Sequence, residues 1–234
     1  MIASGAPAYA AHLEAIDALA PALEAIGIDA PPAPRWNQDW FPRLDAAAAY
    51  TMVRRHRPAR IVEVGSGHST RFLARAVADG ALETRITAID PMPRASLEGL
   101  PIELLRTPVQ TAGRAPFTNL RAGDFLFVDS SHQCRPGSDV EYLFEQILPA
   151  LPQGVFVHFH DIFLPGEYPQ HWSWRRYNEQ PLVAAQIATG GYALEFSSAW
   201  VVACRPERLA EGILARLPLM PAALESSLWL RRAV

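Results

Sequence analysis

The chain has 234 residues, half of them apolar and 19% charged, which suits one α/β domain with an appendage and excludes a disordered chain. All 21 basic residues are arginine, so mechanisms that need a Schiff-base lysine, a lysine base or a P-loop lysine are excluded. The net charge of -3 offers no field for nucleic acid. Without a cationic leader or a run of 18 apolar residues, we expect a cytoplasmic protein with no membrane partner.

Two helices are predicted in the N-terminal part of the chain. Apolar residues at helical spacing predict a helix over Tyr9–Ile26, which Pro21 should kink or split. A Pro-rich linker follows at Ala30–Pro34, and a second helix is expected over Leu44–Arg57. We therefore divide the chain into an N-terminal helical extension with its linker, residues 1–40, and a main domain, residues 41–234.

The main domain alternates short apolar runs with helices, which is typical of a mostly parallel, doubly wound sheet with helices on both faces. Helices are expected over Asp139–Leu148, which opens with the capping box of Ser138 and Glu141, and over Glu179–Thr189. The last two apolar runs are close enough to form an antiparallel pair at one sheet edge. The predicted strands are Arg60–Val64, Arg85–Ile89, Ile102–Leu105, Phe125–Val128, Val155–Phe159, Tyr192–Phe196 and Trp200–Cys204.

A glycine-containing turn follows the first predicted strand. Gly65 and Gly67 allow a ligand to approach the backbone, and the next strand ends at Asp90, where an acidic side chain can bind both ribose hydroxyls. Thr70 stands where the dinucleotide fingerprint has its third glycine, and Glu63 precedes the turn. Both residues disfavour an anionic pyrophosphate and favour an adenosine that carries a sulfonium and an amino group.

Four segments together resemble class I S-adenosylmethionine-dependent methyltransferases, and more closely the bacterial methyltransferase-24-like group. They are Ile61–Thr70, the strand-end Asp90, Val128–His132 and Val157–Ile162, and they are followed by Tyr168–Pro169, Trp172 and Asn178–Gln180. The resemblance implies a Rossmann-like, seven-stranded sheet whose final hairpin supplies the one antiparallel strand. It also implies S-adenosylmethionine as the cofactor. It says little about the acceptor, which we expect to be a small molecule methylated on an oxygen.

The resemblance assigns cofactor contacts residue by residue. The glycine turn would hold the methionine portion, Asp90 the ribose hydroxyls, and Asp129 would lie near the methyl group. The acidic adenine contact of the family is not evident here, and Gln110 is only a weak substitute. The residues assigned to the cofactor are Glu63, Gly65, Ser66, Gly67, Ser69, Asp90 and Asp129.

Methyl transfer to a hydroxyl oxygen needs an aligned acceptor and a base, and histidine suits that role near neutral pH. His132 and His160 are the candidate bases beside Asp129, and His132 is preferred because it follows the fourth strand. Catechol-type relatives commonly carry a lysine at that position. Alternatively, either His132 or His160 is a hydrogen-bonded structural histidine. His158 is expected to lie deeper in the strand and to have a structural role.

A metal site is less favoured than a metal-free site. Catechol-type enzymes place an Asp after the fourth strand and an Asp-Asn pair after the fifth, whereas Ile162 replaces the Asn here. Asp129 and Asp161 are therefore weak candidates for a divalent metal. Adding His132 and His160 would give a mixed set for a transition ion.

The loop Phe163–Tyr177 follows the strand that ends at the expected site, so its aromatic and arginine side chains are candidates for substrate binding: Tyr168, Trp172, Trp174 and Arg175. Alternatively, the tryptophans pack this loop onto the sheet. The N-terminal 40 residues either cap the site or form the contact of a homodimer. Two other functions stay open, a NAD(P)-dependent oxidoreductase and a degenerate cofactor-binding protein without turnover.

Overall fold

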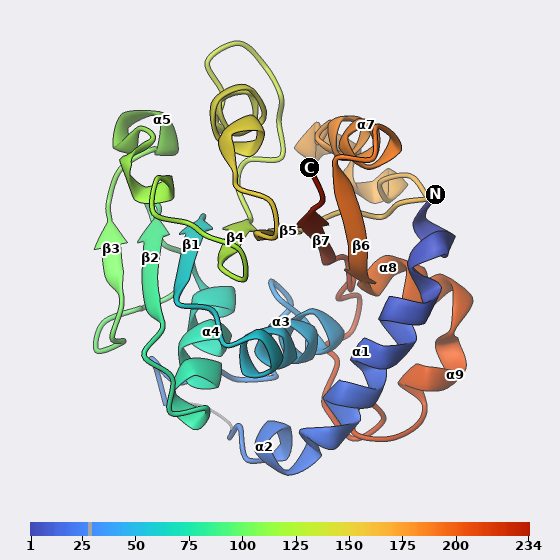
Figure 1. The fold of residues 1–234 in the computed structure, drawn as a ribbon. Coiled ribbons are helices and arrows are strands. Elements are labelled where there is room, and N and C mark those ends of the chain that lie inside the picture. Colours follow the sequence, from blue (N-terminus) through green and yellow to red (C-terminus); the bar gives the residue numbers. More distant parts are fainter. Residues whose placement is uncertain (28–29) are drawn as a thin grey trace.

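One seven-stranded sheet organises the chain. The computed structural model describes residues 1–27 and 30–234. The strand order is β3-β2-β1-β4-β5-β7-β6, and β7 runs antiparallel to both of its neighbours while β1 to β5 are parallel (Figure 1). The strands are β1 (Arg60–Val64), β2 (Arg85–Ile89), β3 (Glu103–Leu105), β4 (Phe125–Val128), β5 (Phe156–Phe159), β6 (Tyr192–Ser197) and β7 (Leu228–Arg232).

The central strands are uniformly apolar or buried because helices cover both faces of the sheet. Every residue of β4 and β5 is buried, as expected for parallel strands in a doubly wound fold. The mostly parallel α/β fold, its five parallel strands and the position of β6 are confirmed to within a residue or two. The parallel strands therefore present their carboxyl ends along one edge of the sheet, at the top of Figure 1.

The last predicted strand is wrong. Trp200–Cys204 lies in helix α8 (Ser198–Cys204), whose first turn is capped by the Ser197 hydroxyl accepting from the Trp200 amide at 3.3 Å. A five-residue apolar run is compatible with a strand and with a buried helical turn. The hydrogen bond from the Trp200 amide to the Ser197 hydroxyl stabilises the start of the helix here. β6 pairs instead with β7, so residues 198–227 separate the two antiparallel strands and they form no tight hairpin.

Helices surround the sheet. The predicted helix over Leu44–Arg57 is α3 (Arg43–His56), which packs against α4 (His68–Asp79). Ser138 caps α6 (Asp139–Tyr142) as expected by accepting from the Glu141 amide, and the helix continues as a π-helical and a 3-10 segment through Ala150. The remaining helices are α5 (Val109–Ala112), α7 (Gln180–Ala188) and α9 (Pro206–Leu209).

The N-terminal helices pack at the β6 side of the molecule. The predicted Tyr9–Ile26 helix is split at Leu19 into α1 (Ala6–Ala18) and α2 (Ala20–Glu24), with Pro21 in the first turn of α2. α1 packs against α3 and β6 (Figure 1). Across the described ranges, none of the helices combines the length and the apolar character that a membrane crossing requires.

Candidate active site

The turn after β1 forms the floor of the site. Gly65 has φ +83°, and a Cβ atom built there would lie 1.8 Å from the Asp129 carbonyl oxygen. Only glycine fits this conformation and this close approach of the β1 and β4 ends. The Gly67 amide then donates to the Thr70 hydroxyl at 2.9 Å, which starts α4. The glycine turn and Asp129 each follow a predicted parallel strand, so the sequence already suggested that they share one edge of the sheet. The structure places them in contact.

A cavity of about 690 Å³ opens beside this turn at the carboxyl ends of β1, β2 and β4. Its volume lies in the range of cofactor sites. Of the residues predicted for the cofactor, Gly65, Ser66, Asp90 and Asp129 line it, and Gln110 also lies in its wall. Further lining residues that we did not predict include Arg94, Ser131 and Asp139.

Asp90 and Ser66 are connected across the cavity wall. The Ser66 hydroxyl donates to Asp90 Oδ2 at 2.9 Å, and the Met92 amide donates to Asp90 Oδ1 at 2.7 Å. These bonds hold the carboxylate in place at the end of β2. The predicted location of Asp90, at the strand end facing the glycine turn, is therefore the observed one.

Glu63 lies beneath the glycine turn and lines neither cavity. It is completely buried, and the Ser69 hydroxyl donates to its Oε1 at 2.6 Å while Oε2 has no hydrogen-bond partner within the described part of the chain. Burial raises the pKa of Glu63 to about 8, against the opposing hydrogen bond from Ser69. A nearby cation would favour the ionised form of this carboxyl group.

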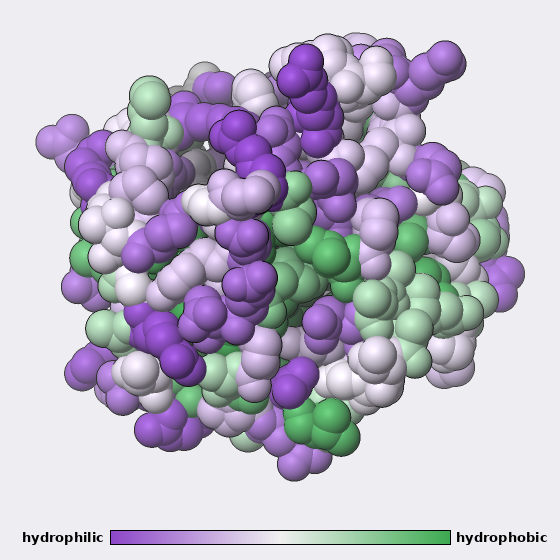
Figure 2. All heavy atoms as spheres, turned by 90° about the horizontal axis from the view of Figure 1, so that it is seen from above, coloured by the Kyte–Doolittle hydropathy of each residue, from purple (hydrophilic) through white to green (hydrophobic). Residues whose placement is uncertain are grey.

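A smaller cavity of about 130 Å³ adjoins the larger one. The two share Ser66, Arg94 and Asp129, so Asp129 lies where they meet. Gly67 and Ser69, which we predicted for the cofactor, line this smaller cavity instead. Figure 2, which looks onto the same edge of the molecule, shows apolar residues gathered near the centre of the face and hydrophilic residues beside them.

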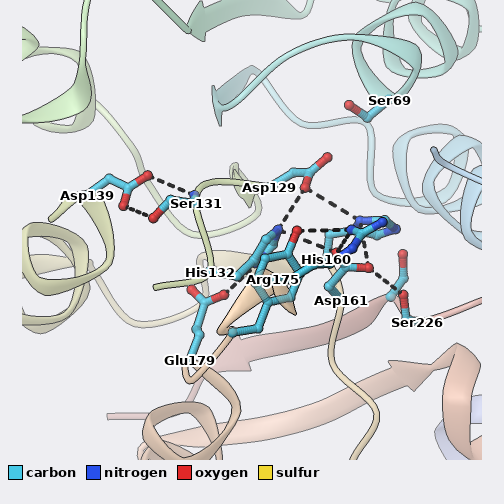
Figure 3. A network of polar contacts seen from close by, with 12 residues as sticks. Ser69, Asp129, Ser131, His132, Asp139, His160, Asp161, Arg175, Glu179 and Ser226 are labelled. Atoms are coloured by element: carbon cyan, nitrogen blue, oxygen red, sulfur yellow. Dashed lines mark hydrogen bonds and ion pairs between the residues drawn. The ribbon is translucent and has the colours of Figure 1, made fainter. Parts of the chain in front are cut away.

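His132 lies between two carboxylates at this junction. Its Nδ1 is 2.9 Å from Oε2 of the fully buried Glu179, and its Nε2 is 3.2 Å from Asp129 Oδ1 (Figure 3). The Nε2 atom is also 3.7 Å from Asp161 Oδ2. Because Glu179 engages one ring nitrogen, the other is aimed at Asp129 and the cavity.

His160 repeats this arrangement from the end of β5. Its Nε2 is 3.3 Å from Oδ2 of the fully buried Asp45, and its Nδ1 is 3.5 Å from the same Asp129 Oδ1. Asp45 is itself fixed by the Ser226 and Ser227 amides, each donating at 2.9 Å. Both imidazoles therefore converge on one oxygen of Asp129, and its second oxygen points away from them in Figure 3.

The charges of this cluster follow from the contacts. Burial lowers the pKa of His132, but hydrogen bonds with Asp129 and Glu179 outweigh it and hold the pKa well above the usual 6.5. For His160, burial is likewise outweighed, by the charges of Asp161 and Asp129. Burial opposes ionisation of Asp129, yet the two imidazoles hold its pKa well below 3.8. The ionised form of Asp129 and the protonated forms of the two imidazoles thus stabilise one another.

The other predicted residues lie around this cluster. His158 is buried as expected, stacked on Phe127 with ring centroids 3.7 Å apart, and burial lowers its pKa. Trp172 and Arg175 line the smaller cavity, whereas Tyr168 does not and its hydroxyl accepts from the Gln180 amide. Trp174 is 73% exposed and lies outside both cavities.

Three functional features escaped prediction. Glu179 and Asp45 hold the outer nitrogens of the two histidines, and the segment Asp39–Phe41 lines the smaller cavity. Asn178–Gln180 carried a signal, since it was part of the resemblance that we used, but nothing in its spacing tied Glu179 to His132. Asp45 gave no signal, because an acidic residue in the first turn of a helix is ordinary.

No metal centre emerges from these contacts. In the described ranges 1–27 and 30–234, no group of three or more histidine, cysteine, aspartate or glutamate side chains has an arrangement suited to holding a metal ion. Asp129 and Asp161 face the two imidazoles and remain metal candidates by sequence only.

Comparisons with known proteins agree with this geometry. Residues 62–162, somewhat less than half of the chain, match a family described as "Methyltransferase domain". The fold resembles the S-adenosylhomocysteine-bound methyltransferase PaMTH1 of Podospora anserina, with 18% identity, a TM-score of 0.52, and coverage of 94% of this chain and 96% of that one. It also resembles the O-methyltransferase TomG of Streptomyces achromogenes, solved with S-adenosylmethionine, with 14% identity, a TM-score of 0.50 and coverage of 94% and 90%. No match was found among curated protein sequences.

The matched domain spans β1 to the end of β5 and so contains the glycine turn, Asp90, Asp129 and His160. Together with the sheet order, the match supports the resemblance to class I, S-adenosylmethionine-dependent methyltransferases. The resemblance seen in the sequence is thereby confirmed. The match also decides against the oxidoreductase alternative, which Glu63 and Thr70 had already disfavoured.

Proposed function

We propose that this enzyme methylates a hydroxyl oxygen of a small molecule, with His132 accepting the hydroxyl proton. The observation that carries the proposal is the convergence of His132 Nε2 and His160 Nδ1 on Asp129 Oδ1, where the two cavities meet. A bond-forming oxygen in the smaller cavity would thus face both a proton acceptor and the cofactor cavity.

The larger cavity fits S-adenosylmethionine, which supplies an electrophilic methyl group on a sulfonium. Asp90, Asp129 and Asp139 line the wall together with Arg94 and Arg135, so carboxylates are available to face a cationic ligand. At Gly65 the Asp129 carbonyl oxygen occupies the place of a Cβ atom, so the turn lies directly against the end of β4. Below the turn, Glu63 Oε2 has no hydrogen-bond partner among the described residues, which favours a positive charge nearby. Ser66 and Asp90 would hold the ribose, and Gln110 lies in the wall where a base could be held.

The chain's own residues would then act on the acceptor. The Glu179 carboxylate fixes Nδ1 of His132, so the hydroxyl proton passes to Nε2. Because the pKa of His132 is raised, this proton transfer needs a pH above the ordinary histidine range, and activity should increase as the solution becomes alkaline. Trp172 and Tyr177 would keep water away from the reacting oxygen.

A comparison of His132→Gln with His171→Gln tests this proposal. His171 is an exposed histidine of the loop Phe163–Tyr177, called the lid loop below, and serves as the matched control. We expect His132→Gln to bind S-adenosylhomocysteine normally by calorimetry, while methyl transfer from labelled S-adenosylmethionine to metabolite pools falls by about 10²–10⁴-fold. Unchanged transfer in His132→Gln would refute the role of His132, and a thermal shift with NAD but none with S-adenosylhomocysteine would refute the cofactor. Binding without any transfer by the wild type would instead favour the degenerate alternative.

A further inference from the structure

Two arginine–tryptophan pairs line the smaller cavity. The Arg94 guanidinium carbon lies 4.6 Å from the ring centroid of Trp40, and that of Arg175 lies 4.1 Å from the ring centroid of Trp172. The four residues come from three segments: the chain before α3, the loop after β2, and the lid between β5 and α7. Tertiary structure has therefore brought the same stacked pair to this cavity twice.

A guanidinium that stacks on an aromatic ring keeps its in-plane N–H donors directed sideways, where they can bind a carboxylate through two parallel hydrogen bonds. The guanidinium group of Arg175 is fixed by two further contacts. Its Nη1 donates to the Tyr177 hydroxyl at 3.1 Å, and the guanidinium carbon lies 5.4 Å from the ring centroid of Trp174. Arg94 is exposed, and within the described part of the chain no carboxylate lies at ion-pair distance from it.

The acidic residues of the site leave these cations largely uncompensated. Asp129 lies 3.2 Å from His132 and 3.5 Å from His160, and Asp161 contacts the same two imidazoles at 3.7 and 3.6 Å. Arg175 reaches Asp161 only at 4.0 Å. Asp129 and Asp161 are thus engaged by the histidines. Asp39 also lines the cavity, but within the described residues no ion pair joins it to Arg94 or Arg175, so both guanidinium groups remain able to bind an anion.

The shape of the cavity limits what this anion is attached to. A volume of about 130 Å³ corresponds to roughly four water molecules at ~30 Å³ each, which is room for the reacting end of a flat molecule. Its walls carry the aromatic rings of Trp40, Phe41, Trp172 and Tyr177. Flat rings on the wall favour a planar ligand that stacks between them.

We infer that the methyl acceptor is a planar aromatic acid, whose hydroxyl faces His132 and whose carboxylate is bound by Arg94 and Arg175. This inference rests on the proposed function for the hydroxyl, but the anion site is a property of the two arginine–tryptophan pairs. Arg94 also lines the cofactor cavity, so one side chain would contact both ligands.

Calorimetry on the S-adenosylhomocysteine-loaded protein tests the inference with matched probes. The probes are 2-, 3- and 4-hydroxybenzoate and the three corresponding hydroxybenzamides, which keep the ring and hydroxyl but lose the charge. We expect at least one benzoate to bind about tenfold or more tightly than its amide. Arg175→Gln and Arg94→Gln should each remove most of this preference, whereas Arg176→Gln, an exposed neighbour outside the cavity, should preserve it.

Each result has one meaning. If no benzoate binds more tightly than its amide, or if the preference survives in both Arg94→Gln and Arg175→Gln, the inference is wrong. Binding of S-adenosylhomocysteine is measured first in the same cell, so a failure of the proposed function, seen as no cofactor binding, is separated from a failure of the anion site.

Discussion

Two imidazole rings in the site share one carboxylate oxygen. Each ring has one nitrogen on a fully buried carboxylate, Glu179 for His132 and Asp45 for His160, and the other nitrogen directed at Asp129. Buried carboxylates of this kind fix the ring orientation and the tautomer without reaching the ligand. We therefore propose that Glu179 and Asp45 are positioning residues.

Removing the charge of Glu179 tests this assignment. Glu179 raises the pKa of His132 through a hydrogen bond and through its charge, so Glu179→Gln should lower that pKa toward 6.5. Because the unprotonated ring accepts the proton in the proposed mechanism, the rising limb of the activity–pH profile should move to lower pH. An NMR titration of the imidazole measures the pKa directly, and the pH dependence of methyl transfer measures its consequence.

Glu167→Gln is the matched control, since Glu167 is an exposed carboxylate of the lid loop. It should leave both the titration and the profile unchanged. If Glu179→Gln lowers activity equally at every pH and the His132 titration does not move, Glu179 only supports the local structure.

At the level of single residues, the site residues at strand ends could be predicted from the sequence, whereas the carboxylates that bind the two histidines could not. Asp90, Asp129 and His160 follow predicted strands, and the carboxyl ends of parallel strands meet at one edge, so sequence order placed them together. Glu179 and Asp45 reach the site from helix starts whose distance from the sheet depends on packing across the whole domain. Periodicity contains no information about that distance.

Among the elements, the β1–α4 turn has the strictest geometric requirement. Gly65 has φ +83°, and an added Cβ atom would lie 1.8 Å from the Asp129 carbonyl oxygen. Gly123 has a similar φ of +90°, but an added Cβ atom would have no atom within 4 Å. Gly123→Ala should therefore cost only conformational strain of about 1–3 kcal/mol in the free energy of unfolding. Gly65→Ala should cost more, and it should also weaken S-adenosylhomocysteine binding, because the ends of β1 and β4 must move apart.

Urea unfolding and calorimetry on the two variants measure these effects. Equal losses of stability, with cofactor binding intact in both variants, would mean that the β4 end yields easily to an added methyl group. The atom displaced by Gly65→Ala is the Asp129 backbone oxygen rather than a side-chain atom, so the end of strand β4 itself must move.

The incorrect strand at Trp200–Cys204 illustrates what remains unpredictable at this scale. Its apolar run has no period that separates strand from helix, and a single capping hydroxyl from Ser197 sets the outcome. The observed partner of β6 is β7, which follows 30 residues later and was not predicted. Whether a short apolar run becomes a strand depends on which edge of the sheet is still unpaired, and that is a property of the completed fold.

On the scale of the whole molecule, the N-terminal helices share the core of the main domain. Tyr9 is fully buried, its hydroxyl donates to the Ile2 carbonyl at 2.9 Å, and its ring lies 6.1 Å from Phe196 and 5.2 Å from Trp200, centroid to centroid. The segment Asp39–Phe41 then continues from the extension into the wall of the smaller cavity. Residues 28–29 of the predicted extension lie outside the described residues.

We expect residues 1–40 and 41–234 to unfold together. Tyr9→Ala removes a buried ring from the interface between α1 and the β6 side of the molecule, which should lower the free energy of unfolding by about 3–5 kcal/mol. Tyr9→Phe keeps the ring and loses only the hydrogen bond to Ile2, so it should cost about 0.5–1.5 kcal/mol. Scanning calorimetry should show one transition for each variant, moved to lower temperature in that order and raised again by S-adenosylhomocysteine. A separate early transition in Tyr9→Ala, with the main transition and its cofactor shift unchanged, would instead mean that the extension is an independent unit attached to a self-sufficient methyltransferase domain.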